Sequence, residues 1–465
     1  MAERGVLTSR TMRAARRLGL WVVVLGWVGC ASYAPHSIEI KNRLAGGRFD
    51  SALEEVDRAK SASSRLLTLY ETGLILHYAQ RFEDSNLQFH EAEILYEDLY
   101  TKSVSRELGA LLTSDTAIEY RGERFESAYL HYYKILNYLH LGDGDAALVE
   151  CRKLNEKLLL FRDAGGTFYT DDPFLQYLTG LVYESEGELA DAWVSYRVAS
   201  DAFERLGAEM GLSAPPSLRC DLARAGSVLG YRDELPERRA GDPCPEPAPG
   251  SGSVVLLLET GFAPHRVEIQ LVAPIFKDDN LKDDFDRDKF AWTLADRAGR
   301  RRVATREVSY WLTIAFPDIV AEPTGIAEIE VLPVEAPTSA TRAARAANIE
   351  AVAVKRFEER RPRMLAKTLA RALAKYLAKE KVTGKQGEVA GMLVNVFNVA
   401  TERADTRSWS TLPGRIHLAR FFLPPGSYTL QVNLRDSGGE KLITIGIPEV
   451  EVESGRTAFL NHRVF

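Results

Sequence analysis

The pattern of apolar and polar residues changes near the middle of the chain. From about residue 38 to residue 205, apolar residues recur at the three- and four-residue spacing of amphipathic helices. After residue 253, several segments alternate apolar and polar residues, as strands with one buried face do. The pattern predicts a helical region followed by a region of strands and helices.

The helical region repeats a pair of helices with tetratricopeptide character. Its clearest unit places small and aromatic residues at the spacing of that repeat, namely Gly180, Tyr183, Gly187, Ala192, Tyr196 and Ala199. An earlier unit has the same spacing at Gly73, Leu76, Ser85, Phe89 and Ala92. We expect Gly180 and Ala192 to lie where two antiparallel helices cross closely, with Tyr196 filling the space beside them. The prediction is an α solenoid of tetratricopeptide-like helical hairpins.

Proline and glycine then mark a boundary between the two parts. Residues 206–252 contain seven prolines and a Gly-Ser-Gly run, which is a composition typical of a linker. The following segment is predicted to be an α+β domain with a β-sandwich-like C-terminal part. The expected divisions are a signal peptide at 1–29, a tether at 30–37, helical repeats at 38–205, the linker at 206–252 and the α+β domain at 253–465.

Strand and helix signals alternate within the α+β domain. Candidate strands lie at 254–258, 266–272, 310–316 and 326–332. Helices are predicted at 349–381 and at 388–402. Residues 428–434 alternate apolar with polar side chains and are followed by a turn and a second alternating run, which predicts a terminal β-hairpin.

The first thirty residues have the features of a bacterial lipoprotein signal. Arginines precede an apolar stretch at 18–29 that is short for a membrane span. The stretch ends in the sequence WVGC, in which Trp27 replaces the usual Leu and Cys30 is the expected lipidation site. Because Ala31 rather than Asp follows, we expect a lipid anchor on the periplasmic face of the outer membrane. An uncleaved transmembrane anchor and a twin-arginine signal at 16–17 are the alternatives.

Composition and charge narrow the choice of partners. The chain has 465 residues, of which 45% are hydrophobic and 27% charged, as in ordinary globular proteins. Its net charge is −6, and residues 1–29 carry five arginines and one glutamate, so their removal leaves about −10. A mildly acidic protein without a nucleic-acid-binding motif argues against DNA or RNA as a partner.

The four cysteines have different expected roles. Cys30 is the lipid site, and Cys151 falls in a strongly helical stretch where a small apolar residue packs well. Cys220 and Cys244 flank the proline-rich segment and can form a disulfide in an oxidising periplasm. Spacing alone leaves this pairing open, because the geometry of a disulfide is not encoded in sequence distance.

Motifs for catalysis and for metal binding are incomplete. His90 begins a sequence like that of a zinc-protease helix, but Ile94 stands where the second His ligand is needed. The alternating aspartates at 284–288 resemble a calcium loop, but Lys289 replaces its turn glycine. We expect no catalytic residues, no metal and no cofactor, and a hydrolase is the least favoured hypothesis.

A basic helix is the strongest candidate for a contact surface. Ten basic and three acidic residues lie between Lys355 and Lys381. Four of them are spaced to share one helix face, namely Lys367, Arg371, Lys375 and Lys379. This face could bind anionic lipid or an acidic partner. The alternative is an ordinary amphipathic helix that covers a sheet.

Several blocks together resemble an uncharacterised family of bacterial outer-membrane lipoproteins with tetratricopeptide-like repeats. They lie at 131–139, 142–148, 172–183, 349–354, 405–413 and 423–426. The resemblance covers most of residues 40–434 and is specific only as a combination. It implies no enzymatic activity and, by association with neighbouring lipoproteins, a role in envelope assembly.

These observations predict a lipid-anchored periplasmic adaptor that mediates protein–protein interactions in envelope assembly. Its partners would be envelope proteins, including other outer-membrane lipoproteins. Residues expected to line the groove of the repeats are Tyr78, Tyr133, Tyr138 and Tyr183, although packing between repeats is the commoner role of such residues. The alternative function is an envelope glycan- or lipid-binding module that uses the basic helix.

Overall fold

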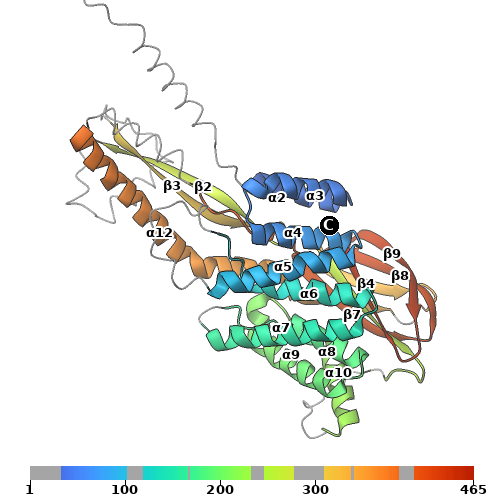
Figure 1. Cartoon of the computed structure of the whole chain (residues 1–465). Helices are drawn as coiled ribbons and strands as arrows, with labels where there is room; N and C mark the ends of the chain where they lie inside the picture. The colour runs from blue at the N-terminus through green and yellow to red at the C-terminus, as the bar shows by residue number, and fades with distance from the viewer. Residues whose placement is uncertain are drawn as a thin grey trace, which may run out of the picture.

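The chain folds as a helical region followed by a region of strands and one long helix (Figure 1). The computed structural model describes residues 33–101, 119–165, 168–231, 244, 246–276, 308–336, 340–386 and 403–465. Cys30 and the rest of the expected signal lie outside these residues, as does the helix predicted at 388–402. None of the described helices combines the length and the apolar character that a membrane span needs.

The described helices of the first region pack mainly as consecutive pairs. They are α2 (Tyr33–Ala45), α3 (Phe49–Arg58), the short η1 (Ala59–Ser61), α4 (Arg65–Tyr78), α5 (Phe82–Thr101), α6 (Arg124–His140), α7 (Gly144–Ala164), α8 (Pro173–Ser185), α9 (Leu189–Met210) and α10 (Pro216–Leu229). The pairs are α2 with α3, α4 with α5, α6 with α7, and α8 with α9, and α10 packs on α9. Side chains cap several of these helices. Asp172, for example, accepts hydrogen bonds from the N–H groups of Phe174 and Leu175 at 3.1 Å.

Glycine permits the close crossing that the repeat pattern predicted. A Cβ atom on Gly180 of α8 would lie 2.5 Å from the ring of Tyr196 on α9. A Cβ atom on Gly73 of α4 would lie 2.7 Å from the ring of Phe89 on α5. Both distances are too short for a side chain, so glycine is required where an aromatic ring crosses the neighbouring helix.

The strands form two four-stranded sheets and one separate hairpin. They are β1 (Gly252–Thr260), β2 (His265–Phe276), β3 (Val308–Val320), β4 (Glu328–Pro333), β5 (Thr341–Arg342), β6 (Ala344–Asn348), β7 (Arg415–Leu423), β8 (Gly426–Arg435), β9 (Lys441–Val452) and β10 (Thr457–Val464). The sheet orders are β10-β1-β7-β6 and β5-β4-β8-β9, and β2 pairs only with β3. β10 runs parallel to β1, whereas β7 runs antiparallel to it.

Strand β1 lies between two hydrophobic cores. Val255 and Leu257 belong to the large core that includes residues of α4 to α10. Val254, Leu256 and Leu258, which point to the opposite face, belong to a second core shared by the two sheets. This explains why all nine residues of β1 are buried, and it makes the helices and strands parts of one packed body.

The segment predicted to be a linker is partly helical. α10 occupies Pro216–Leu229 within the expected linker at 206–252. Leu218, Leu222 and Ala225 of α10 are buried in the large core. The boundary predicted from proline content is therefore wrong for this stretch, because apolar residues between the prolines give the helix a face to bury.

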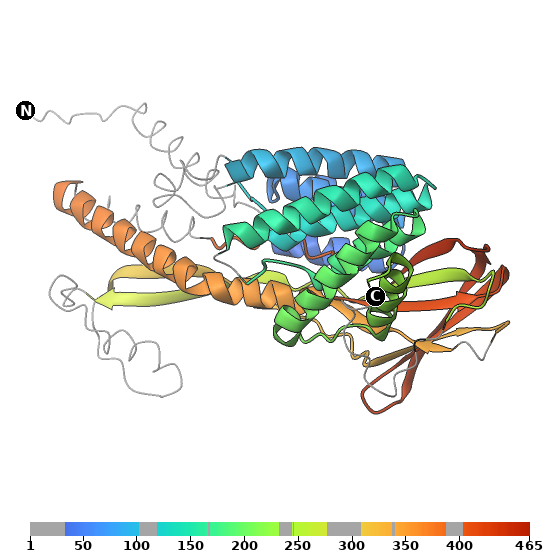
Figure 2. The same cartoon turned by 90° about the horizontal axis from the view of Figure 1, so that it is seen from below.

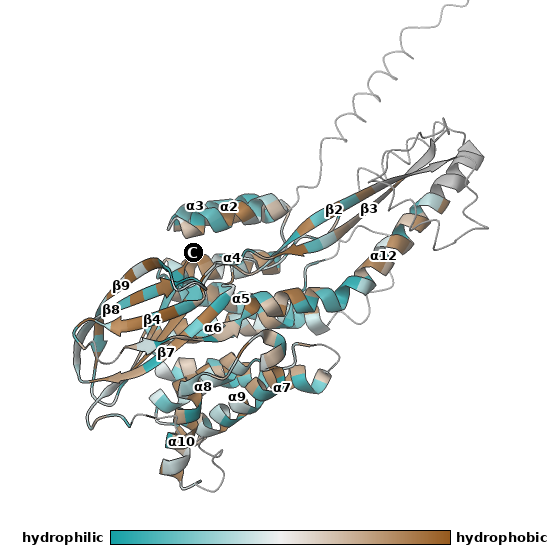
Figure 3. Ribbon diagram, turned by 180° about the vertical axis from the view of Figure 1, so that it is seen from behind, coloured by the Kyte–Doolittle hydropathy of each residue, from teal (hydrophilic) through white to brown (hydrophobic). Residues whose placement is uncertain are grey.

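A long helix and the β2–β3 hairpin extend together from the body. Helix α12 (Ile349–Gln386) has 38 residues, which corresponds to about 57 Å at the rise of an α-helix. It packs against β3, and both views show α12, β2 and β3 reaching away from the sheets and helices (Figures 1 and 2). We call these three elements the arm. Polar and apolar residues alternate along the described part of α12, as the colouring of Figure 3 shows.

Candidate functional site

One face of the helical pairs packs against the second half of the chain. The first helix of each described pair hydrogen-bonds to it. The contacts are Ser37 with Ser410 at 2.6 Å, Glu71 with Thr411, Tyr132 with Glu259 at 2.8 Å, and Glu184 with Arg420 at 2.7 Å. This face of the helical pairs is therefore covered by residues of β1, β7 and the segment before β7.

Glu259 is the centre of this internal contact. Its fully buried carboxylate accepts a hydrogen bond from the Tyr78 hydroxyl at 2.6 Å and from the Tyr132 hydroxyl at 2.8 Å. Burial raises the pKa of Glu259, while the charge of Arg463 and the tyrosine hydroxyls oppose the rise. Arg463 also donates to the hydroxyl of Tyr78 at 2.8 Å and to the carbonyl of Gly261 at 2.5 Å. The cluster fastens β1 and β10 to α4 and α6.

The four tyrosines expected in an open groove have other positions. Tyr133 is completely buried and Tyr183 is 4% exposed, so the prediction is wrong for both. Their rings pack inside the large core, which leaves no surface for a partner. Tyr78 is half-buried and its hydroxyl is engaged by Glu259. Tyr138 is half-buried at the edge of the same core.

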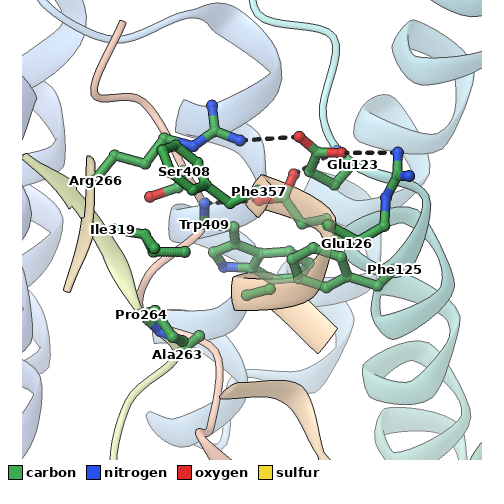
Figure 4. A pocket seen from close by; sticks show the side chains of 12 residues that line it. Glu123, Phe125, Glu126, Ala263, Pro264, Arg266, Ile319, Phe357, Ser408 and Trp409 are labelled. Carbon is green, nitrogen blue, oxygen red and sulfur yellow. Dashed lines mark hydrogen bonds and ion pairs between the residues drawn. The ribbon is translucent and has the colours of Figure 1, made fainter. Parts of the chain in front are cut away.

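A small pocket lies where the arm joins the body (Figure 4). Its volume is about 20 Å³. Its residues come from the start of α6, the start of β2, the end of β3, the first half of α12 and the segment before β7. They are Glu123, Phe125, Glu126, Ala263, Pro264, Arg266, Ile319, Ala353, Arg356, Phe357, Ser408 and Trp409. We call this the arm-root pocket.

Glu123 binds three arginines at this pocket. One of its carboxylate oxygens lies 2.9 Å from Arg266 and 2.5 Å from Arg360, and the other lies 3.6 Å from Arg356. Burial alone would raise the pKa of Glu123, but the charges of Arg360, Arg266 and Arg356 bring it below its ordinary value. Glu123 is therefore ionised, and it links the body to both β2 and α12.

Glu126 lies one helical turn further along α6 in a different environment. Burial, followed by the charge of Glu123, raises the pKa of Glu126. Its carboxylate accepts hydrogen bonds from the Tyr120 hydroxyl at 2.5 Å, from the N–H of Glu123 at 2.8 Å and from the N–H of Trp409 at 2.9 Å. Glu123 and Glu126 thus each contact three donor groups.

The block at 405–409 forms a structural corner at this site. Arg407 binds both oxygens of Asp405, at 2.8 Å and 3.0 Å. Trp409 is 1% exposed and stacks on Tyr70 with ring centroids 4.5 Å apart. The packing of Trp409 places this corner at one wall of the arm-root pocket.

The basic face predicted on the long helix is not an exposed surface. Arg371 is 1% exposed, and Lys367 and Lys375 are half-buried. The side chain of Lys379 lies outside the described residues. The apolar residues Leu369, Leu373 and Leu377 are instead exposed, at 44%, 39% and 40%. The expected orientation of the helix is therefore wrong, because Thr368, Arg371, Ala372 and Tyr376 form its buried face.

A second cluster, away from the arm-root pocket, combines side chains of the types that bind metal ions. Carboxylate oxygens of Glu93 and Glu150 and a ring nitrogen of His131 lie within 4.8 Å of one another. The Lys134 ammonium group, however, lies 2.8 Å from both carboxylates, and Lys153 also contacts both. A lysine occupies the position of a cation, so we interpret this cluster as an ion-pair network between α5, α6 and α7.

The cysteines differ in environment. Cys220 of α10 and Cys244 form a disulfide across a separation of 24 residues, which is the pairing that spacing left open. Cys151 is free and fully buried in α7. Burial raises the pKa of its thiol strongly, so Cys151 is a packing residue and not a nucleophile.

The arm-root residues carry no local signal in the sequence. Glu123, Arg266 and Arg356 are separated by at least ninety positions from one to the next, and each alone resembles a surface charge. The block at 405–413, one of those that carry the family resemblance, includes Ser408 and Trp409 of the pocket. Comparison with known proteins adds no further assignment, since no family model and no curated protein matches this chain.

Proposed function

We propose that this protein is a lipid-anchored adaptor on the periplasmic face of the bacterial outer membrane, and that its arm binds the partner. In this proposal the helical region is a tetratricopeptide-like solenoid, and its inner face holds the chain's own α+β region with a β-sandwich-like end. The internal contacts at Glu259 and Arg420 support the choice of the arm as the binding element. They occupy the helical face that repeat proteins usually offer to a partner.

The observation that carries the proposal is a row of exposed leucines on α12. Leu369, Leu373 and Leu377 are four residues apart, so they project from one side of the helix. A helix in a monomer normally buries such a row. The arm also stands clear of the body in both views (Figures 1 and 2), so a partner can reach it without displacing the body.

The leucine row specifies the kind of partner. Leu369, Leu373 and Leu377 present an exposed apolar stripe. The complementary surface is the apolar face of an amphipathic segment of another envelope protein. The glycan- or lipid-binding alternative requires the basic side chains to face outward, and the burial of Arg371 counts against it.

Site-specific photocrosslinking in native membranes tests the proposal. A benzoylphenylalanine at Leu373 of the full chain should give one dominant protein adduct. The matched control places the same residue at Leu87 of α5, which is 63% exposed but lies on the body. Replacing Leu369 and Leu377 with glutamine should remove the Leu373 adduct while leaving the fold intact, as circular dichroism would show.

Two outcomes would contradict the adaptor assignment. Equal adducts from Leu87 and Leu373 would mean that the arm has no special role. Adducts with lipid alone, together with flotation of the protein lacking its lipid anchor on vesicles of anionic phospholipid, would favour the lipid-binding alternative.

A further inference from the structure

The arm-root pocket contains hydrogen-bond donors that have no acceptor. The Nε atom of Arg356 and the Nε1 atom of Trp409 are both buried and unpartnered. Both residues line the pocket, of which Figure 4 shows Trp409, and they are only 8% and 1% exposed. A buried donor without a partner costs free energy, and a donor of a charged group costs more. The pocket therefore lacks an acceptor.

The two carboxylates of the pocket already have several donors each. Glu123 contacts Arg266, Arg356 and Arg360. Glu126 accepts from Tyr120 and from two backbone N–H groups. A water molecule would bring two donors of its own, for which few free acceptors remain. An anion brings acceptor capacity alone.

Charge and size restrict the anion. Within the described residues, Arg266, Arg356 and Arg360 form ion pairs with two carboxylates, those of Glu123 and Glu359. Burial raises the pKa of the third carboxyl, Glu126, and the group carries one positive charge when Glu126 holds its proton. The volume of about 20 Å³ exceeds the roughly 10–15 Å³ that a single water requires but excludes a bulky ligand. The remaining walls are apolar and come from Phe125, Ala263, Pro264, Ile319, Ala353 and Phe357.

We infer that the arm-root pocket binds a monovalent anion of halide size, held by the Nε–H of Arg356 and the Nε1–H of Trp409. The walls of the pocket belong to α6, β2, β3, α12 and the segment before β7. An anion at this point is therefore a bridge between the arm and the body. This inference does not depend on the adaptor assignment, since it concerns the root of the arm and not its leucine row.

Nuclear magnetic resonance of the indole N–H groups tests the inference on the full chain in detergent. Sodium chloride is titrated against sodium gluconate at constant ionic strength, because gluconate is too large for the pocket. The Trp409 resonance, assigned by its loss in Trp409→Phe, should shift and saturate. Trp193 supplies an internal control, because its Nε1 is also buried and unpartnered but it does not line the pocket.

A conservative variant tests the Nε donor of Arg356 separately from the positive charge of that residue. Arg356→Lys keeps a positive charge opposite Glu123 but removes the Nε donor, and it should weaken chloride binding by about tenfold or more. The inference is overturned if the Trp409 resonance does not respond to chloride. It is also overturned if Trp193 shifts equally, or if Arg356→Lys binds chloride as the unmodified chain does.

Discussion

The guanidinium group of Arg420 lies 2.6 Å from the carboxylate of Asp221, and each side chain is only 2% exposed. Arg420 is on β7 and Asp221 is on α10, so a buried ion pair joins the strands to the helices. Arg420 also binds Glu184 of α8 at 2.7 Å. Although burial alone would raise it, the charges of Arg420 and Arg224 bring the pKa of Glu184 down to about 2. Glu184 is therefore ionised where it contacts Arg420.

Replacing Arg420 should destabilise the fold strongly. Arg420→Met removes the buried partner of Asp221 and Glu184 and leaves them the partly exposed Arg224 alone. Loss of one partner of a buried ion pair costs about 3–5 kcal/mol of the free energy of unfolding. Urea denaturation followed by circular dichroism measures the loss. Arg65→Met is the control, since Arg65 pairs with Glu91 where both side chains are more than half exposed, and it should cost less than about 1 kcal/mol. Equal losses would contradict the role of the buried pair.

Stability should fall with rising pH because of Glu71. Burial raises the pKa of this carboxyl from 4.5 to about 7, so the folded state holds the proton more tightly than the unfolded state. The resulting stabilisation is complete below pH 4.5 and is lost as the pH rises through 7, which amounts to about 3 kcal/mol. Unfolding in urea between pH 4.5 and 8 should show this slope in the native chain and a reduced slope in Glu71→Gln.

A surface carboxylate provides the comparison for Glu71. Glu54 is on α3, where its side chain is 66% exposed, and Glu54→Gln should leave the slope unchanged. If Glu71→Gln also leaves it unchanged, the carboxyl is ionised throughout this interval and the burial argument fails.

Loss of the disulfide should destabilise the chain moderately. Cys220 and Cys244 close a loop with a separation of 24 residues, for which the loop-entropy model gives roughly 3 kcal/mol. The double variant Cys220→Ala, Cys244→Ala should unfold at correspondingly lower urea concentration, and a reducing agent should not destabilise it further. Complete alkylation of both thiols in the unreduced, denatured native chain would show that the bond does not form.

A single methyl group at Gly180 should disturb the packing of α8 on α9. Its Cβ would lie 2.5 Å from the ring of Tyr196, and overpacking of this kind costs about 1–3 kcal/mol. Gly446→Ala is the control, because no atom lies within 4 Å of the added Cβ. Thermal unfolding compares the two variants, and a Gly180→Ala protein as stable as the control would mean that the ring moves aside freely.

Local patterns predicted local structure well. The spacing that placed Gly180 and Tyr196 in one repeat depends on residues sixteen positions apart, and the structure brings them together. The alternation at 428–434 likewise gave β8. Short-range periodicity carries this information because a helix or strand places neighbouring side chains at fixed angles.

Contacts between residues far apart in the sequence could not be predicted from periodicity. The partners of Glu259 come from Tyr78 and Tyr132, which are 181 and 127 positions away. The orientation of α12 was also missed, since its leucines and its lysines each form a regular row and the pattern alone does not say which row is buried. Packing against β3 decides that question, and only the assembled fold shows it.

The bonds from successive helical pairs to the strands have a consequence for how this protein can evolve. Repeat arrays gain and lose units readily when each unit touches only its neighbours. Here Ser37, Tyr132 and Glu184 each bond to a different residue of the second half. Duplication or deletion of one pair would move every later pair away from its own bonding residue. The number of helical pairs is thus held constant by the strands they face.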